Sequence, residues 1–221
     1  MRMRKKKNLV PRMERCAAVH VQDGFALKGH WRETLMPEAK ELRVELGCGK
    51  GRFTVETARE NPEILFIAIE RVADAMVVSM ERAVALELKN VFFVVGDAAL
   101  VPEYFEEDEV DLIYVNFCDP WPPKGQAKRR LTHRGFLMTY RKVLKTGGQI
   151  HFKTDNQPLF EFSVLEFPEA GYALSEVTRD LHGNGPCGVM TDYEAKFYEE
   201  GITINRCVGT KLPEVPSGEA D

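Results

Sequence analysis

Short apolar runs alternate with stretches of helical periodicity along most of this chain. Five runs have the length and composition of buried strands, at residues 42–46, 64–69, 91–95, 110–117 and 149–153. Several are apolar on both faces, as strands covered by helices on each side are. Between them, apolar residues recur at helical spacing in three sets: Met76, Met80, Ala83 and Val84; Phe136, Leu137, Tyr140 and Leu144; and Phe160, Val164 and Phe167.

The order of these segments predicts the fold class. Strands and helices that alternate along a chain indicate an α/β fold with a mainly parallel sheet and helices on both faces. After Gly171, residues 172–181 and 202–208 are predicted to form two final strands, the second of which can run antiparallel, with a short helix near 191–199 between them. No internal repeat and no interdomain linker is evident. We therefore predict a partly flexible basic extension at 1–40, one domain at 41–212 and a flexible acidic tail at 213–221.

Composition is that of an ordinary soluble protein. The chain has 221 residues, of which 44% are hydrophobic and 29% charged. No apolar run approaches membrane-spanning length, and the basic residues 2–7 lack the apolar segment that a signal peptide needs, so we expect a cytoplasmic protein without membrane contact. Five scattered cysteines without a Cys-x-x-Cys pair argue for reduced thiols and against a structural metal site.

Charge is distributed unevenly along the chain. The net charge of −4 discourages a polyanionic partner, but basic residues concentrate at 2–7 and 124–134, and acidic residues at 103–111 and 214–221. Local patches rather than the total determine where a polyanion docks. A basic run is more often a solvated surface or a flexible tail, so charge alone does not establish nucleic-acid binding.

An acidic residue stands at the end of every one of the five predicted strands. These residues are Glu45, Glu70, Asp97, Asp119 and Asp155. In open α/β sheets, ligands bind beyond the carboxyl ends of the strands, near the point where the strand order reverses. Five acids at corresponding positions therefore predict a ligand site at that edge.

Three glycines follow the first strand, at Gly47, Gly49 and Gly51. They allow a tight turn and close approach of a ligand, although a plain strand-to-helix turn would also use them. Their spacing departs from the Gly-x-Gly-x-x-Gly of dinucleotide-binding folds, and Glu45 just before them favours a cationic amine over phosphates. Glu70 is placed to accept hydrogen bonds from ribose hydroxyls, and Asp97 could hold an adenine amino group. An amine, a ribose and an adenine together describe S-adenosylmethionine.

The fourth strand ends in the more specific motif, Asn116-Phe-Cys-Asp119-Pro-Trp-Pro-Pro123. Three prolines restrict the backbone, and Trp121 offers a flat face on which a base can stack, although it could also close a core. Cys48 and Cys118 lie within the two motifs. We interpret both as packing residues, because no histidine in either motif could activate a thiol.

Together these segments resemble a known family, the bacterial tRNA (guanine-N7-)-methyltransferases of the TrmB type. The resemblance runs from about Glu41 to Leu212. It is carried by Glu45-Leu-Gly-Cys-Gly-Lys-Gly51, Ile69-Glu70, Gly96-Asp97-Ala98, Asn116-Phe-Cys-Asp119-Pro-Trp-Pro, Ala127-Lys-Arg-Arg-Leu-Thr-His133, Thr154-Asp155-Asn156 and Thr191-Asp-Tyr-Glu194. It implies a class I, Rossmann-like methyltransferase fold with a seven-stranded sheet, S-adenosylmethionine as cofactor, and methylation of a variable-loop guanine, position 46, in tRNA. A monomer or a homodimer is expected.

The resemblance also implies roles for individual residues. The cofactor set is Glu45, Gly47, Gly49, Gly51, Glu70, Asp97, Ala98, Asn116 and Asp119. Asp119 is implied to be catalytic as well. The substrate and RNA set is Lys124, Lys128, Arg129, Arg130, Asp155, Thr191, Tyr193 and Glu194. One departure stands out, because the family's usual lysine after Asp-Pro-Trp-Pro is Pro123 here and the lysine follows as Lys124.

The chemistry of this assignment is coherent from the residues upward. Guanine N7 has an available lone pair, so alignment with the methyl group matters more than proton removal, and a carboxylate such as Asp119 can stabilise the positive charge that develops on the purine. Three alternatives remain: another base methyltransferase that attacks an exocyclic amine, a non-catalytic RNA-binding protein, and a nicotinamide oxidoreductase. The glycine spacing and the lack of a histidine or tyrosine placed to handle hydride argue against the last.

Overall fold

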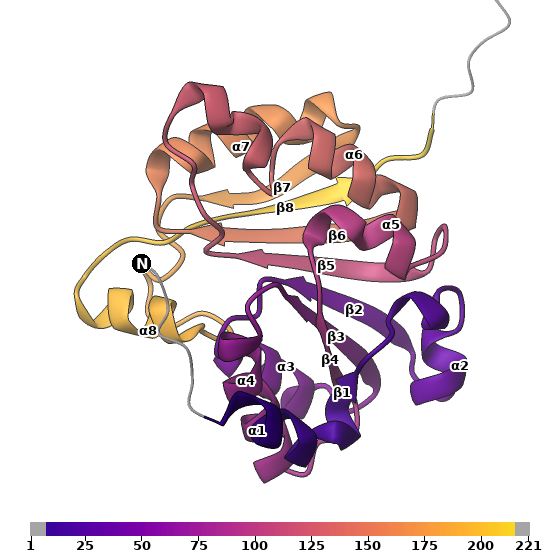
Figure 1. Cartoon of the computed structure of the whole chain (residues 1–221). Coiled ribbons are helices and arrows are strands. Elements are labelled where there is room, and N and C mark those ends of the chain that lie inside the picture. Colours follow the sequence, from indigo (N-terminus) through magenta and orange to yellow (C-terminus); the bar gives the residue numbers. More distant parts are fainter. Residues whose placement is uncertain (1–7, 215–221) are drawn as a thin grey trace, which may run out of the picture.

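A computed structural model describes residues 8–214, except for the side chain of Lys124. It contains one eight-stranded sheet in the order β1-β4-β3-β2-β5-β6-β8-β7 (Figure 1). The strands are β1 (His20–Val21), β2 (Glu41–Leu46), β3 (Ile64–Glu70), β4 (Val91–Val95), β5 (Val110–Asn116), β6 (Leu144–Thr154), β7 (Tyr172–Thr178) and β8 (Asn205–Lys211). Strand β8 is antiparallel to both its neighbours and the other pairs are parallel. The predicted mostly parallel α/β fold is confirmed.

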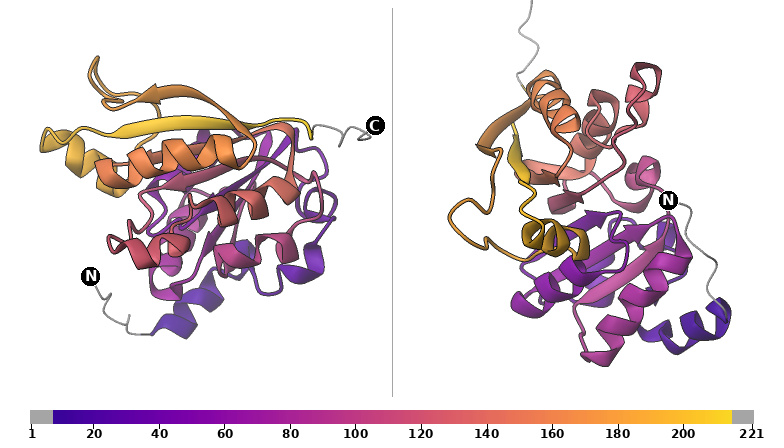
Figure 2. Two further views of the ribbon diagram at one scale, coloured as in Figure 1. Left: turned by 90° about the horizontal axis from the view of Figure 1, so that it is seen from above. Right: turned by 90° about the vertical axis from the view of Figure 1, so that its left-hand side faces the viewer.

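Helices cover both faces of the sheet (Figures 1 and 2). They are α1 (Leu9–Arg15), α2 (Trp31–Leu35), α3 (Arg52–Glu60), α4 (Ala73–Ala85), α5 (Val101–Tyr104), α6 (Arg134–Val143), α7 (Gln157–Glu169) and α8 (Asp192–Glu199). Short 3-10 turns are η1 (Ala17–Val19), η2 (Phe25–Leu27), η3 (Ala98–Leu100) and η4 (Lys124–Arg129). One core packs α5, α6 and α7 against the sheet, and a second packs α3 and α4 against the other face.

Several boundaries differ from the sequence prediction. The sheet has an eighth strand, β1, which is only two residues long and pairs with β4, so it carries no periodic signal of its own. Val84 is 39% exposed near the end of α4 and does not share the buried face of Met76, Met80 and Ala83. Leu144 begins β6 rather than ending α6. The last two strands run from 172 to 178 and from 205 to 211, rather than from 172 to 181 and from 202 to 208, and their pairing has an irregularity between Ser175 and Thr178.

The segment before β2 packs closely on the rest of the molecule. The Trp31 indole is fully buried, and its Nε1 donates to the Tyr104 carbonyl oxygen at 2.7 Å. Phe25 stacks on the Tyr104 ring with 4.7 Å between ring centroids. Phe25 and Trp31 of the predicted basic extension thus pack against α5. The predicted flexibility of residues 1–7 and 215–221 lies outside the described residues. None of the helices in residues 8–214 combines the length and apolar character required to cross a bilayer.

The strand order sets the place of the site. The chain runs outward from β2 through β3 to β4, then crosses back to β5 on the other side of β2. The carboxyl ends of β2 to β5 consequently lie along one edge, with the switch in direction between β2 and β5.

Candidate active site

A pocket of about 520 Å³ opens at this edge of the sheet. Ten of the predicted site residues line it: Gly47, Gly49, Glu70, Asp97, Ala98, Asn116, Asp119, Lys128, Arg129 and Tyr193. They come from the loops after β2, β3, β4 and β5, from η4 and from α8. The size falls within the range usual for small-molecule sites.

The glycine turn has the left-handed backbone that its sequence predicts. Gly47, Gly49 and Gly51 have φ angles of 85°, 56° and 76°. Gly51 has a packing role, because a Cβ built there would lie 1.6 Å from the Ser79 hydroxyl of α4, whereas one built at Gly49 would meet nothing within 4 Å. Gly47 and Gly49 line the pocket and Gly51 does not. The first two glycines of the turn thus face the pocket, whereas Gly51 allows the start of α3 to pack closely against α4.

Glu70 connects the glycine turn to the end of β3. Its Oε2 accepts from the Gly49 amide at 3.0 Å and its Oε1 accepts from the Val72 amide at 2.8 Å. Each oxygen keeps a further lone pair for a ligand hydroxyl. Asp97, after β4, accepts from the Ala99 amide at 2.9 Å, and its other oxygen lies 4.0 Å from a guanidinium nitrogen of Arg71.

Glu45 is buried beneath this turn and does not line the pocket itself. Its carboxylate is 2% exposed and accepts from the Thr54 hydroxyl at 2.5 Å and from Asn116 Nδ2 at 3.0 Å. Burial raises the pKa of Glu45, an effect that the two hydrogen bonds oppose. The Oδ1 of Asn116 is buried without a partner among the described residues. A buried carboxylate beside an unused amide oxygen suits a ligand ammonium group, so the residues fit the predicted cofactor.

The turn after β5 carries Asp119 to the pocket as an exposed side chain. Two non-glycine residues of this turn have positive φ angles, Phe117 at 52° and Trp121 at 44°. The Arg129 guanidinium lies 3.5 Å from the centroid of the Trp121 ring. Burial raises the pKa of the Cys118 thiol to about 12, and that of Cys48 well above its usual value, which supports the packing interpretation of both cysteines.

The predicted substrate residues separate into two groups. Lys128, Arg129 and Tyr193 lie at the pocket, and the Tyr193 side chain is 66% exposed on α8. Arg130, Asp155, Thr191 and Glu194 do not line it. The side chain of Lys124 lies outside the described residues, so its role stays a prediction.

Thr191 and Glu194 form the cap of α8. The Thr191 hydroxyl accepts from the Glu194 amide at 2.9 Å, and the Glu194 carboxylate accepts from the Thr191 amide at 3.2 Å, as in a capping box. The Glu194 side chain has no exposed area and also bonds Lys153 Nζ at 2.6 Å and His182 Nε2 at 3.1 Å. Sequence reasoning missed Lys153 and His182. The one available signal was a lysine within an apolar strand directly before Thr154-Asp155.

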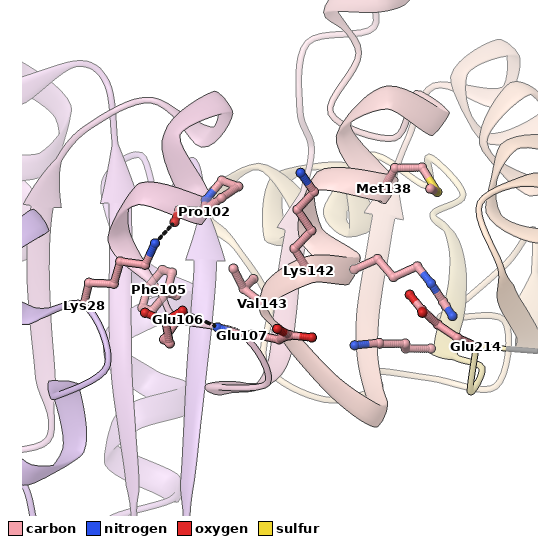
Figure 3. A pocket seen from close by; sticks show the side chains of 11 residues that line it. Lys28, Pro102, Phe105, Glu106, Glu107, Met138, Lys142, Val143 and Glu214 are labelled. Atoms are coloured by element: carbon pink, nitrogen blue, oxygen red, sulfur yellow. Dashed lines mark hydrogen bonds between the residues drawn. The ribbon is translucent and has the colours of Figure 1, made fainter. Parts of the chain in front are cut away.

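A second pocket, of about 380 Å³, lies toward the amino ends of β5 and β6 (Figure 3). Lys28 donates to the Pro102 carbonyl oxygen at 2.8 Å there, and Glu106 and Lys142 also line it. None of the predicted site residues belongs to this pocket. The ten predicted site residues that line a pocket are therefore those at the carboxyl edge of the sheet.

Comparisons with known proteins agree with the fold. The 16S rRNA methyltransferase KamB superposes with a TM-score of 0.64 at 18% identity, covering 82% of this chain and 92% of that one. A mutant 16S rRNA (adenine(1408)-N(1))-methyltransferase from Catenulisporales acidiphilia, solved with cosubstrate SAM, gives a TM-score of 0.56 at 17% identity over 85% and 93% of the chains. The fold is that of a class I methyltransferase.

Sequence comparisons narrow this class to a family. A family model described as "Putative methyltransferase" matches residues 39–207. The tRNA (guanine-N(7)-)-methyltransferase of Clostridioides difficile (strain 630) is 41% identical over 96% of this chain and 99% of its own length. The enzyme of the same name from Lactococcus lactis subsp. cremoris (strain MG1363) is 39% identical over 97% and 100%. The chain belongs to the tRNA (guanine-N(7)-)-methyltransferase family.

Proposed function

We propose that this protein transfers a methyl group from S-adenosylmethionine to N7 of the guanine at position 46 in the variable loop of tRNA. The observation that carries the proposal is the pocket in which the glycine turn, Asp119 and the basic residues Lys128 and Arg129 meet. Relatives of that activity match nearly the whole chain, which supports the same assignment. We propose a cytoplasmic protein, monomeric or homodimeric, with tRNA as its partner.

The cofactor half of the pocket is formed by residues at the carboxyl ends of β2, β3, β4 and β5. We assign the ammonium group to Asn116 Oδ1 and the Glu45 carboxylate, which are buried side by side. The ribose hydroxyls are assigned to Glu70 and the adenine to Asp97 and Ala98. S-adenosylmethionine supplies the methyl group when bound. Gly47 and Gly49 permit its close approach because neither has a Cβ.

The substrate half holds the guanine for in-line attack. N7 needs no deprotonation, so the contribution of these residues is alignment and charge stabilisation. The exposed Asp119 carboxylate faces the pocket and would offset the positive charge that forms on the purine. Trp121 presents a ring on which a base can stack once Arg129 moves from it.

The test is methylation of tRNA by the purified protein with methyl-labelled S-adenosylmethionine, followed by nucleoside analysis. The expected product is 7-methylguanosine, lost when position 46 of the transcript is changed to adenine. Asp119→Asn keeps the shape of the side chain and removes its charge, so turnover should fall much more than tRNA affinity.

Two other outcomes would overturn the assigned activity, and a third would change the role of Asp119. Label on an exocyclic amine would make the protein a different base methyltransferase. Binding of tRNA without any methylation, with the protein folded and S-adenosylmethionine bound, would make it a non-catalytic RNA-binding protein. Equal losses of turnover and affinity in Asp119→Asn would assign Asp119 to binding.

A further inference from the structure

The turn that carries Asp119 has an unfavourable backbone. Bulky residues rarely adopt positive φ angles, yet Phe117 and Trp121 do so on either side of Asp119. Such a conformation is unfavourable and persists only where the surroundings hold the residue in place. Pro120 and the two prolines after Trp121 have no amide hydrogen, so the turn has few donors with which to bond itself. Some other group must hold it.

Arg130 supplies the missing hydrogen bonds. Its Nε donates to the Pro120 carbonyl oxygen at 2.9 Å, and its Nη2 donates to the Trp121 carbonyl oxygen at 3.1 Å. These are the first two carbonyls after Asp119. The guanidinium group also lies 4.4 Å from the centroid of the Phe162 ring on α7. Hydrogen bonds from a charged donor are stronger than those between neutral groups, so these two can offset the backbone strain of the turn.

The main chain of Arg130 is anchored as well. Its amide donates to the Ala127 carbonyl at 3.0 Å, and its own carbonyl accepts from the His133 amide at 3.0 Å, at the start of α6. The side chain is half-buried. Arg130 therefore connects the Asp119 turn to α6 and α7, with its Nε and Nη2 both bonded to that turn.

Arg129 is placed differently. It lines the pocket, its guanidinium covers the Trp121 ring, and among residues 8–214 it has no hydrogen-bond or ion-pair partner. Stacking on an aromatic face leaves the donors at the edge of the guanidinium available to a phosphate. The two arginines are adjacent in the chain, yet their guanidinium groups contact different parts of the Asp119 turn.

From this arrangement we propose that Arg130 is a positioning residue that fixes the Asp119 turn, while Arg129 alone of the two contacts RNA. The inference rests on the proposed function. The sequence assigns both arginines to RNA binding, whereas the inference gives them two different roles. A lysine could not replace Arg130, because an ammonium group lacks the planar fork that reaches two carbonyls at once.

The test compares Arg130→Gln, Arg130→Lys and Arg129→Gln in steady-state tRNA methylation over a range of salt concentrations. Both Arg130 variants should lose at least tenfold in kcat, with KM for tRNA within about threefold of the parent and an unchanged salt slope. Arg129→Gln should raise KM and flatten the salt slope by roughly one counterion. Arg130→Lys keeps the positive charge, so a loss of kcat in that variant is caused by the loss of the planar guanidinium group that bonds both carbonyls.

Hydrogen exchange of the segment 117–123, measured without RNA, gives a readout independent of activity. Exchange there should accelerate in both Arg130 variants and stay at the parent level in Arg129→Gln. A flattened salt slope with normal kcat and normal exchange in Arg130→Gln would overturn the inference. An inactive parent protein would refute the proposed function instead, and the exchange measurement would still decide the role of Arg130.

Discussion

Replacing Lys153 with methionine removes the positive charge from a buried ion pair and keeps most of the side-chain volume. Lys153 lies on β6, is 7% exposed, and donates to Glu194 at 2.6 Å and to the Val189 carbonyl oxygen at 3.1 Å. After Lys153→Met, the fully buried Glu194 carboxylate keeps only His182 and the Thr191 amide.

The expected loss of stability follows from the loss of the lysine partner of Glu194. Removing one partner of a buried pair typically destabilises a protein by about 3–5 kcal/mol, because the remaining charge is left uncompensated. Burial lowers the pKa of Lys153, although Glu194 opposes the shift, so the folded protein already bears part of the cost of burying this charge. We therefore expect the lower end of the range, about 3 kcal/mol. Glu194→Gln combined with Lys153→Met should recover much of it, since neither member of the pair then carries a buried charge.

Urea unfolding of the single and double variants measures this coupling. Lys211→Met is the matched control, because Lys211 is also a buried lysine that bonds a carboxylate, Asp108 at 3.0 Å, and a carbonyl. Asp108 is half-exposed and returns to water when its partner is lost, so the control should cost less. Equal costs for the two lysines, with additive effects of Lys153→Met and Glu194→Gln, would refute the reasoning.

Three further predictions concern the pocket and the sheet. Glu70→Ala should weaken S-adenosylmethionine binding by about 1.5–3 kcal/mol in calorimetry, and unchanged affinity would remove Glu70 from the site. Gly51→Ala should lower the free energy of unfolding by about 2–5 kcal/mol through strain and the clash with Ser79, and Gly49→Ala by only about 1–2 kcal/mol; similar losses in chemical denaturation would contradict this. Burial lowers the pKa of His151 from 6.5 to about 4, so the unfolded chain binds more protons between these values and stability falls as the pH falls through them. His151→Gln should reduce the change in the free energy of unfolding over this pH range, by at most roughly 3 kcal/mol. The same pH dependence in the variant and the parent would show that another group is responsible.

The sequence was sufficient for the sheet edge and its acids because each signal there is local. A strand, its terminal acid and the following glycines are neighbours in the chain, so Glu70 and Asp97 could be placed from their positions after 64–69 and 91–95. Glu45 was placed at the right edge, but its burial beneath the turn depends on Thr54 and Asn116 and was not predictable locally.

Long-range pairing explains what the sequence could not reveal. Lys153 and Glu194 are 41 residues apart, and nothing near either one identifies the other as its partner. Arg129 and Arg130 are adjacent residues of one type, so the sequence gives no reason to assign them different roles. They differ only in their contacts in the folded protein, the Trp121 ring for Arg129 and the Pro120 carbonyl for Arg130. A two-residue strand such as β1 has no periodicity to detect.

The buried contact between Trp31 and Tyr104 bears on how this chain folds during synthesis. The two residues are 73 positions apart, and β1 likewise waits for β4, which lies at a similar separation. At about 5–20 residues per second, translation of that interval takes on the order of 4–15 s. Over this time the indole ring and the edge of β1 have no partner and remain in water. The segment before β2 can therefore dock only after β4 and α5 have been made, and its apolar residues are open to chaperones during that interval.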